Sequence, residues 1–100
     1  MRKQLISDIE TYLKEAIILY NQEGIVLKNI FFELSSRIFY LRKEDFDSKE
    51  KYDFFLRFYN QPRRSTERHL LENNFKDDNL YGSKFLWLCD YFEGIKNRLK

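Results

Sequence analysis

The sequence predicts an all-α fold, a compact bundle of about five helices that forms a single domain over residues 1–100. Apolar residues recur at intervals of three and four positions along most of the chain, which is the spacing of one face of an α-helix. Where that period breaks, the chain carries residues that commonly begin or end helices, among them Gly24, Ser48 and Pro62. One hundred residues are enough to enclose a hydrophobic core without disulfide bonds or a structural metal.

Two long helices are expected in the first half of the chain. Residues 2–22 repeat apolar side chains with the helical period, and Gly24 follows as a residue that tolerates the positive φ of a helix end. The same period continues through residues 26–43, which predicts the second helix. β-Branched and aromatic side chains also favour strands, so helix and strand both stay open for residues 25–32.

A third and a fourth helix are expected on either side of the proline. Ser48 precedes a charged run and suits the N-cap of a helix over residues 49–60, because its hydroxyl can accept a hydrogen bond from the first turn. Ser65 or Thr66 is expected to cap a short helix over residues 66–74 in the same way.

The last helix is expected over residues 84–99, after a loop at residues 73–83 that is rich in turn-forming side chains. Ser83 is its predicted N-cap. A cysteine on an apolar helix face behaves as a small hydrophobic residue, so Cys89 is predicted to be buried and unreactive. The predicted core face of this helix consists of Phe85, Leu88, Cys89, Phe92, Ile95 and Leu99.

The composition excludes several classes of site. Cys89 and His69 are the only cysteine and the only histidine, which rules out a disulfide within the chain and leaves too few ligands for a zinc site. No apolar run approaches the ~18 residues that a membrane-spanning helix needs. Acidic residues near the N-terminus interrupt what would have to be the apolar core of a signal peptide. We therefore expect a soluble cytoplasmic protein without a metal or another cofactor.

Aromatic residues make up 18% of the chain, more than a domain of this size readily encloses. Two aromatic pairs, Phe54 with Phe58 and Trp87 with Tyr91, lie beside the predicted core faces. The members of each pair are four residues apart and are therefore neighbours on a helix surface. Two interpretations stay open: the pairs pack against neighbouring helices, or they form an interface for a partner or for a second copy of the chain.

The segment RSTERH, residues 64–69, contains the only histidine. An arginine and a histidine separated by four residues, with polar Ser65 following the arginine, resemble the motif of HEPN ribonucleases, which are compact α-helical domains. The resemblance covers six residues. It implies that His69 acts as a general base on a ribose 2′-hydroxyl and that Arg64 stabilises the phosphate charge. It also implies a dimer in which two such motifs face each other.

The same stretch is compatible with nucleic-acid binding. Arg57, Arg63, Arg64 and Arg68 lie within twelve residues, and Phe58 beside them could stack on a base. The formal net charge is only +2, whereas a dedicated nucleic-acid binder usually carries a clear basic excess. Nucleic acid is therefore a less favoured partner than protein.

We predict that the chain is a small inhibitor that binds another protein and sterically blocks a toxin or another enzyme, for example a nuclease. Bacterial immunity proteins, antitoxins and phage-encoded inhibitors share this size. An acidic segment at residues 43–54 could cover a basic cleft, and the arginine-rich turn at residues 63–68 is a second candidate surface. The predicted contact residues are Glu44, Asp45, Asp47, Glu50, Asp53, Phe54, Phe58, Arg63, Arg64, Arg68, Trp87 and Tyr91.

Overall fold

The computed structural model describes residues 2–72 and 78–100; within these ranges, the side chains of Thr66, of residues 69–72 and of residues 78–84 lie outside the described part. Five α-helices and one short 3-10 helix follow one another along the chain. They are α1 (Arg2–Glu23), α2 (Lys28–Phe39), η1 (Lys43–Asp45), α3 (Lys49–Tyr59), α4 (Arg63–Glu72) and α5 (Asp78–Leu99). The described residues contain no strand, so the all-α prediction is confirmed and the strand alternative at residues 25–32 is wrong.

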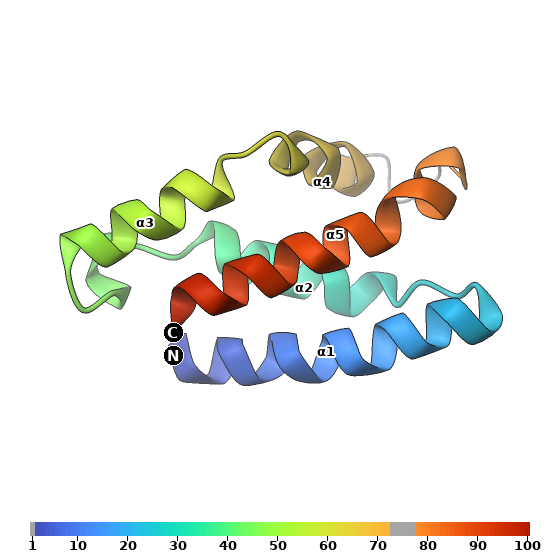
Figure 1. Cartoon of the computed structure of the whole chain (residues 1–100), viewed down its shortest axis with the longest axis horizontal. Helices are drawn as coiled ribbons and strands as arrows, with labels where there is room; N and C mark the ends of the chain where they lie inside the picture. The colour runs from blue at the N-terminus through green and yellow to red at the C-terminus, as the bar shows by residue number, and fades with distance from the viewer. Residues whose placement is uncertain (1, 73–77) are drawn as a thin grey trace.

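Helix α5 lies at the centre of the arrangement (Figure 1). It packs against α1 on one side and against α3 and α4 on the other, and α1 also packs against α2. The C-terminal end of α5 runs beside the N-terminal half of α1, where Lys96 Nζ and Lys100 Nζ approach Glu10 Oε1 at 3.8 and 3.6 Å. The described chain is elongated, with principal extents of 41 × 24 × 17 Å.

Aromatic rings around α5 form a substantial part of the core. Phe31 of α2 stacks on Phe92 of α5 with ring centroids 4.7 Å apart, which joins these two helices through the interior. All six residues of the predicted core face of α5 are buried, so that prediction is confirmed. Cys89 is one of them, and burial raises the pKa of its thiol to about 12. A thiol with so high a pKa is almost entirely protonated near neutral pH and is a poor nucleophile.

Two predicted helix boundaries are confirmed in their details. Gly24 ends α1 with a φ of 68°, and its N–H donates to the carbonyl of Tyr20 at 2.8 Å. An L-amino acid with a side chain rarely adopts this φ, which is why glycine suits the position. Ser48 caps α3, because its Oγ accepts a hydrogen bond from the Lys51 N–H at 3.2 Å.

The predicted second helix is too long at both ends. It was expected over residues 26–43, but α2 begins at Lys28 and ends at Phe39. Beyond it, Asp45 Oδ2 accepts the Arg42 N–H at 2.8 Å, and Arg2 Nη1 donates to the Asp45 carbonyl at 2.7 Å. In these contacts, side chains bond to backbone groups that a longer helix would use itself, and the segment after α2 forms a short 3-10 helix. The apolar periodicity of the sequence does not reveal such contacts.

Two predicted N-caps are wrong. Helix α4 begins at Arg63, directly after Pro62, and the Ser65 N–H donates to the Pro62 carbonyl at 3.1 Å in its first turn. Proline suits a helix start because its φ is already helical and its missing N–H needs no partner there. Ser83 lies inside α5, which extends back to Asp78 through much of the predicted loop.

The extension of α5 shows how weakly turn-forming residues oppose a helix. Each such residue costs at most about 1 kcal/mol relative to alanine, which packing elsewhere along a long helix can offset. The remaining part of that predicted loop, at residues 73–77, lies outside the described residues.

Candidate functional site

Five side chains on the α3–α5 face alternate between aromatic rings and guanidinium groups. We call them the arginine–aromatic stack; in spatial order they are Phe54, Arg98, Phe58, Arg63 and Trp87. Arg98 Cζ lies 5.2 Å from the ring centroid of Phe54 and 3.8 Å from that of Phe58. Arg63 Cζ continues the series at 5.9 Å from Phe58 and 5.6 Å from Trp87. Each such contact contributes about 0.5–1 kcal/mol at an exposed site and more where water is excluded.

Helical spacing explains why the stack forms. Trp87, Tyr91, Gly94 and Arg98 are separated by four, three and four residues, so they share one face of α5. Phe54 and Phe58 are separated by four residues on α3 and face it. The sequence therefore places large rings and long basic side chains along the same seam between two helices.

A glycine makes room for the central ring of the stack. A Cβ added at Gly94 would lie 2.2 Å from Cζ of Phe58, closer than two carbon atoms can approach. The Phe58 ring therefore lies almost directly on the backbone of α5. Behind it, Tyr91 is fully buried, and its ring centroid is 5.9 Å from that of Phe58.

Arg63 is fixed by polar contacts as well as by rings. Its Nη1 forms an ion pair with Asp90 Oδ2 at 2.8 Å and donates to the Trp87 carbonyl at 3.3 Å. Its Nε donates to Gln61 Oε1 at 2.7 Å. The side chain is only 15% exposed. Arg63 thus holds the start of α4 against α5 and has little freedom to reach a distant ligand.

Each of the two predicted aromatic pairs has one exposed ring and one ring packed inward. In each pair one member is exposed, Phe54 at 51% and Trp87 at 38%. The other member packs inward, with Tyr91 in the core and Phe58 half-buried against it. Each pair therefore supplies one ring to the interior and one to the surface, so the packing interpretation is confirmed for Phe58 and Tyr91. The interface interpretation stays a prediction for the two exposed rings.

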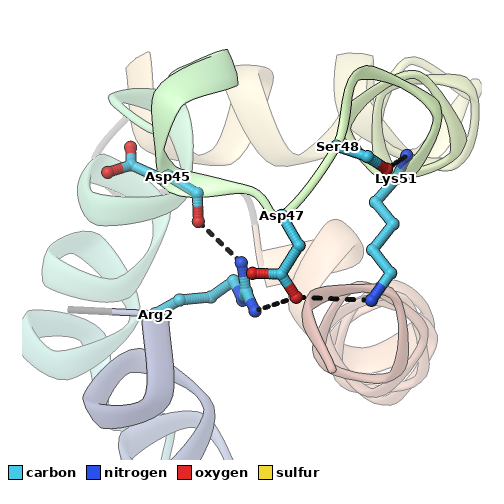
Figure 2. A network of polar contacts seen from close by, with 5 residues as sticks. All are labelled: Arg2, Asp45, Asp47, Ser48 and Lys51. Carbon is cyan, nitrogen blue, oxygen red and sulfur yellow. Dashed lines mark hydrogen bonds and ion pairs between the residues drawn. The ribbon is translucent and has the colours of Figure 1, made fainter.

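The acidic segment at residues 43–54 is partly neutralised by basic side chains (Figure 2). Asp47 Oδ2 lies 3.3 Å from both Lys51 Nζ and Arg2 Nη2. The hydrogen bond from Lys51, followed by the charge of Arg2, lowers the pKa of the Asp47 carboxyl below its ordinary value. Arg2 also donates to the carbonyl of Asp45, whose own carboxylate is used in the turn after α2. Two of the five predicted acids thus serve local structure.

The other three predicted acids and the aromatic residue of this segment lie differently. Glu44 and Glu50 are exposed, and Asp53 is half-buried on α3. Phe54 belongs to the arginine–aromatic stack on the α3–α5 face. Two of the predicted acids therefore have partners within the protein and two others are exposed, and the acidic binding surface stays a prediction.

A separate groove lies between α2 and α4, with a volume of about 550 Å³. We call it the α2–α4 groove. Its aromatic lining comes from Phe32, Phe39, Tyr40 and Tyr59. Tyr40 is 71% exposed and Phe39 is 56% exposed, and their rings meet edge to face with centroids 5.1 Å apart.

The polar lining of the α2–α4 groove comes mainly from α4. Arg64 Cζ lies 4.7 Å from the ring centroid of Tyr59 and 5.5 Å from that of Phe39, so its guanidinium extends along the aromatic lining. Its Nη1 is 3.8 Å from Glu67 Oε1. Arg68 also lines the groove and is exposed to solvent.

Three buried oxygens of residues that line this groove have no hydrogen-bond partner among the described residues. They are Glu67 Oε2, Ser35 Oγ and Tyr59 Oη. The three residues are 1%, 3% and 6% exposed. Burial raises the pKa of the Glu67 carboxyl to about 7, although Arg64 opposes the shift. Burial, and then the charge of Glu67, raises the pKa of Tyr59 to about 12.

The arginine and histidine of the RSTERH segment both lie on α4. The guanidinium of Arg64 is 14% exposed and contacts the groove as described above. The side chain of His69 lies outside the described part, so its distance from Arg64 is not assigned.

Several residues of these two regions were not predicted from the sequence. Arg98 lies on the same face of α5 as Trp87. Its spacing of four residues from Gly94 could have indicated that it belongs to this face. Phe39 and Tyr40 lie at the end of α2, outside its predicted core positions, and both are largely exposed. Glu67 appears in the sequence as one acid among arginines, and nothing in the pattern indicates that it is buried.

Comparison with protein-family models, with curated proteins and with solved structures found no match. Among the residues that the structure describes, no cluster of histidine, cysteine and acidic side chains could hold a metal ion. Within the same residues, no helix combines the length and the apolar character needed to cross a membrane.

Proposed function

We propose that the protein acts by binding another protein, and that the arginine–aromatic stack is the docking face. The observation that carries this proposal is the exposure of Phe54 and Trp87 at the two ends of a row of rings and guanidinium groups. Tryptophan, tyrosine and arginine are the residues most enriched among those that dominate interface energies. Since each of the two exposed rings already packs against an arginine in the free protein, less side-chain freedom remains to be lost on binding.

The proposed partner has a surface with two apolar pockets and acidic groups at their edge. Phe54 and Trp87 would fill the pockets. Arg98 Nη1 donates a hydrogen bond to the Gly94 carbonyl at 3.1 Å. The other N–H groups of this guanidinium could donate to a carboxylate of the partner. Glu50 and Asp53, on the same helix as Phe54, would lie at the rim and chiefly affect the rate of association.

We further propose that binding inhibits the partner by steric occlusion, as in immunity proteins, antitoxins and phage-encoded inhibitors. A preformed rigid face on a small helical domain suits this role, because it can cover an active site without rearranging. The partner would be a toxin or another enzyme, and a nuclease is one candidate class.

Photo-crosslinking followed by reconstitution tests the proposal. A photoreactive residue at position 87 captures the partner for identification, and the same residue at position 18 on α1 serves as the control. With both proteins purified, Trp87→Ala should weaken binding at least ~10-fold, since central interface anchors typically contribute 2 kcal/mol or more. Ile18→Ala removes an exposed apolar side chain from α1, outside the stack, and should leave the affinity unchanged. Equal affinities for the two variants would contradict the proposed docking face.

The HEPN-like ribonuclease is the alternative function, and one assay separates it from the inhibitor. The purified wild-type protein and His69→Ala are incubated side by side with single-stranded RNA. We expect no cleavage by either protein. Cleavage that His69→Ala and Arg64→Ala both abolish would instead establish the ribonuclease.

A further inference from the structure

We propose that α4 is a pH-sensitive element, which loosens from the other helices when Glu67 loses its proton and thereby withdraws Arg63 from the arginine–aromatic stack. The inference goes beyond the proposed function, because it concerns the free protein and holds whether or not the stack binds a partner. Among the described side chains of α4, only that of Glu67 is buried. A titratable group thus occupies a buried position on a helix of ten residues.

The Glu67 carboxyl lies in the interior with one basic side chain nearby. The residue is 1% exposed. Its Oε1 lies 3.8 Å from Arg64 Nη1, which is beyond hydrogen-bond distance. A buried charge is costly unless it is both paired and hydrogen-bonded, so the interior favours the protonated carboxyl. The packing of α4 against the other helices therefore favours the protonated form.

No other group around this carboxyl, among the described side chains, titrates near neutral pH. The charged and titratable groups that face it are Arg64 and Arg68 of α4, Tyr59 of α3 and Tyr91 of α5. From α2 it meets the Ser35 hydroxyl, which does not titrate. Burial raises the pKa values of both phenols above their ordinary value. Burial also raises the pKa of the Glu67 carboxyl to about 7, although Arg64, Ser35 and Arg68 oppose the shift.

Arg63 connects this carboxyl to the stack. It lies four residues before Glu67 at the start of α4, and it contacts α5 through Asp90 Oδ2 at 2.8 Å and the Trp87 carbonyl at 3.3 Å. The charge of an ionised Glu67 regains water if α4 moves outward. Such a movement carries Arg63 with it and breaks both contacts with α5. Ionisation therefore favours a state in which the row of rings and guanidinium groups ends at Phe58.

Amide hydrogen exchange of the full-length protein tests the inference, because it detects local openings that are rarely populated. Glu67 has a pKa of about 7 in the closed state, and its ordinary value of 4.5 is expected once α4 has opened. Raising the pH from 5 to 8 should increase the opening equilibrium constant of α4 roughly 70-fold, after correction for the intrinsic pH dependence of exchange. Low concentrations of urea should leave this opening unchanged while they accelerate exchange in the core of α1, which requires unfolding of the whole chain.

Two variants assign the pH dependence to Glu67. Glu67→Gln has no proton to lose, so its α4 amides should show the same opening constant at pH 5 and at pH 8. His69 is the only histidine of the chain and titrates in the same range. His69→Ala should keep the pH dependence of the wild type. The inference is overturned if α4 opens equally at both pH values, if Glu67→Gln retains the pH dependence, or if α4 exchanges only when the whole chain unfolds.

A second pair of variants tests the link between α4 and the stack. Asp90→Ala removes the ion-pair partner of Arg63, and its side chain is 75% exposed, so the fold should persist. If opening breaks this ion pair, the variant should raise the opening constant of α4 roughly 2–5-fold at both pH values. Glu93→Ala removes an acid of α5 that pairs with Lys96 and should leave the opening of α4 unchanged. Equal opening in Asp90→Ala and the wild type would overturn the link, because Arg63 would then stay in the stack.

Discussion

The arginine–aromatic stack and the α2–α4 groove use the same kinds of side chain in opposite ways. In the stack the arginines have polar partners within the protein: Arg63 pairs with Asp90, and Arg98 donates to the Gly94 carbonyl. In the groove, buried oxygens of Ser35, Tyr59 and Glu67 lack such partners. The arginines of the stack are therefore paired within the protein, while the rings at its two ends stay exposed.

Tyr91 connects the two regions, and its removal should have the largest effect on stability. Its ring stacks on Phe58 of the stack and lies 6.4 Å from that of Tyr59, and its hydroxyl donates to the Tyr59 carbonyl. Tyr91→Ala should lower the free energy of unfolding by about 3–5 kcal/mol. Tyr91→Phe, which removes only the hydrogen bond, should cost roughly 1 kcal/mol. Urea denaturation measures both, and equal losses would show that the ring contributes nothing.

Glu67 should make the groove a source of pH-dependent stability. Its pKa is about 7 in the folded protein, against an ordinary value of 4.5. Between these values the folded state retains a proton that the unfolded state has lost, so stability falls as the pH rises from about 4.5 to about 7. At about 1.4 kcal/mol for each pKa unit, this loss amounts to roughly 3 kcal/mol above pH 7.

The variant Glu67→Gln isolates that contribution because its side chain does not titrate. It should be more stable than the wild type at pH 8, and this advantage should disappear by pH 5. Urea denaturation of both proteins at the two pH values checks the sign. A wild-type protein that gains stability relative to the variant as the pH rises would mean that the charged carboxylate is favourably paired.

Gly94→Ala should perturb the stack and leave the groove unchanged. The added methyl group collides with the Phe58 ring, and overpacking of this kind costs about 1–3 kcal/mol. The replacement of a helical glycine by alanine offsets roughly 1 kcal/mol of that cost. A modest net destabilisation is therefore expected, with weakened binding of the proposed protein partner. A stabilised variant with unchanged partner affinity would show that the position of Phe58 is unimportant.

The exposed ends of the stack should affect stability least. Phe54→Ala and Trp87→Ala remove side chains that are 51% and 38% exposed, so each should change the free energy of unfolding by about 1 kcal/mol or less. Thermal denaturation checks this. A large loss at either position would indicate that the ring serves the fold more than a partner.

The sequence predicted those features that depend on local spacing. The core face of α5, the helix stop at Gly24 and the cap at Ser48 follow from periodicity and from single-residue preferences. Part of the stack could also be predicted from spacing. The four-residue spacing within two aromatic pairs indicated two aromatic faces, those of Phe54 with Phe58 and of Trp87 with Tyr91. That these faces meet, with Arg63 and Arg98 between the rings, depends on the packing of α3 against α5.

The α2–α4 groove could not be predicted, because it depends on contacts between segments that are distant in sequence. Ser35, Tyr59 and Glu67 belong to three different helices, and no spacing relates them. Phe39 and Tyr40 line the groove where α2 ends, and just beyond that end the Asp45 carbonyl is contacted by Arg2 from the start of the chain. The partial neutralisation of the acidic segment could not be predicted for the same reason, since Arg2 pairs with Asp47 from the start of the chain.

The affinity of the identified partner for Trp87→Ala, measured beside Ile18→Ala by calorimetry, tests the proposed docking most directly. Both variants lose one exposed apolar side chain, and only the first loses a member of the arginine–aromatic stack. The docking account predicts that Trp87→Ala binds at least ~10-fold more weakly than the wild type, while Ile18→Ala binds equally well and inhibits the partner fully. Unchanged binding by Trp87→Ala, or a loss of the same size in both variants, would contradict it.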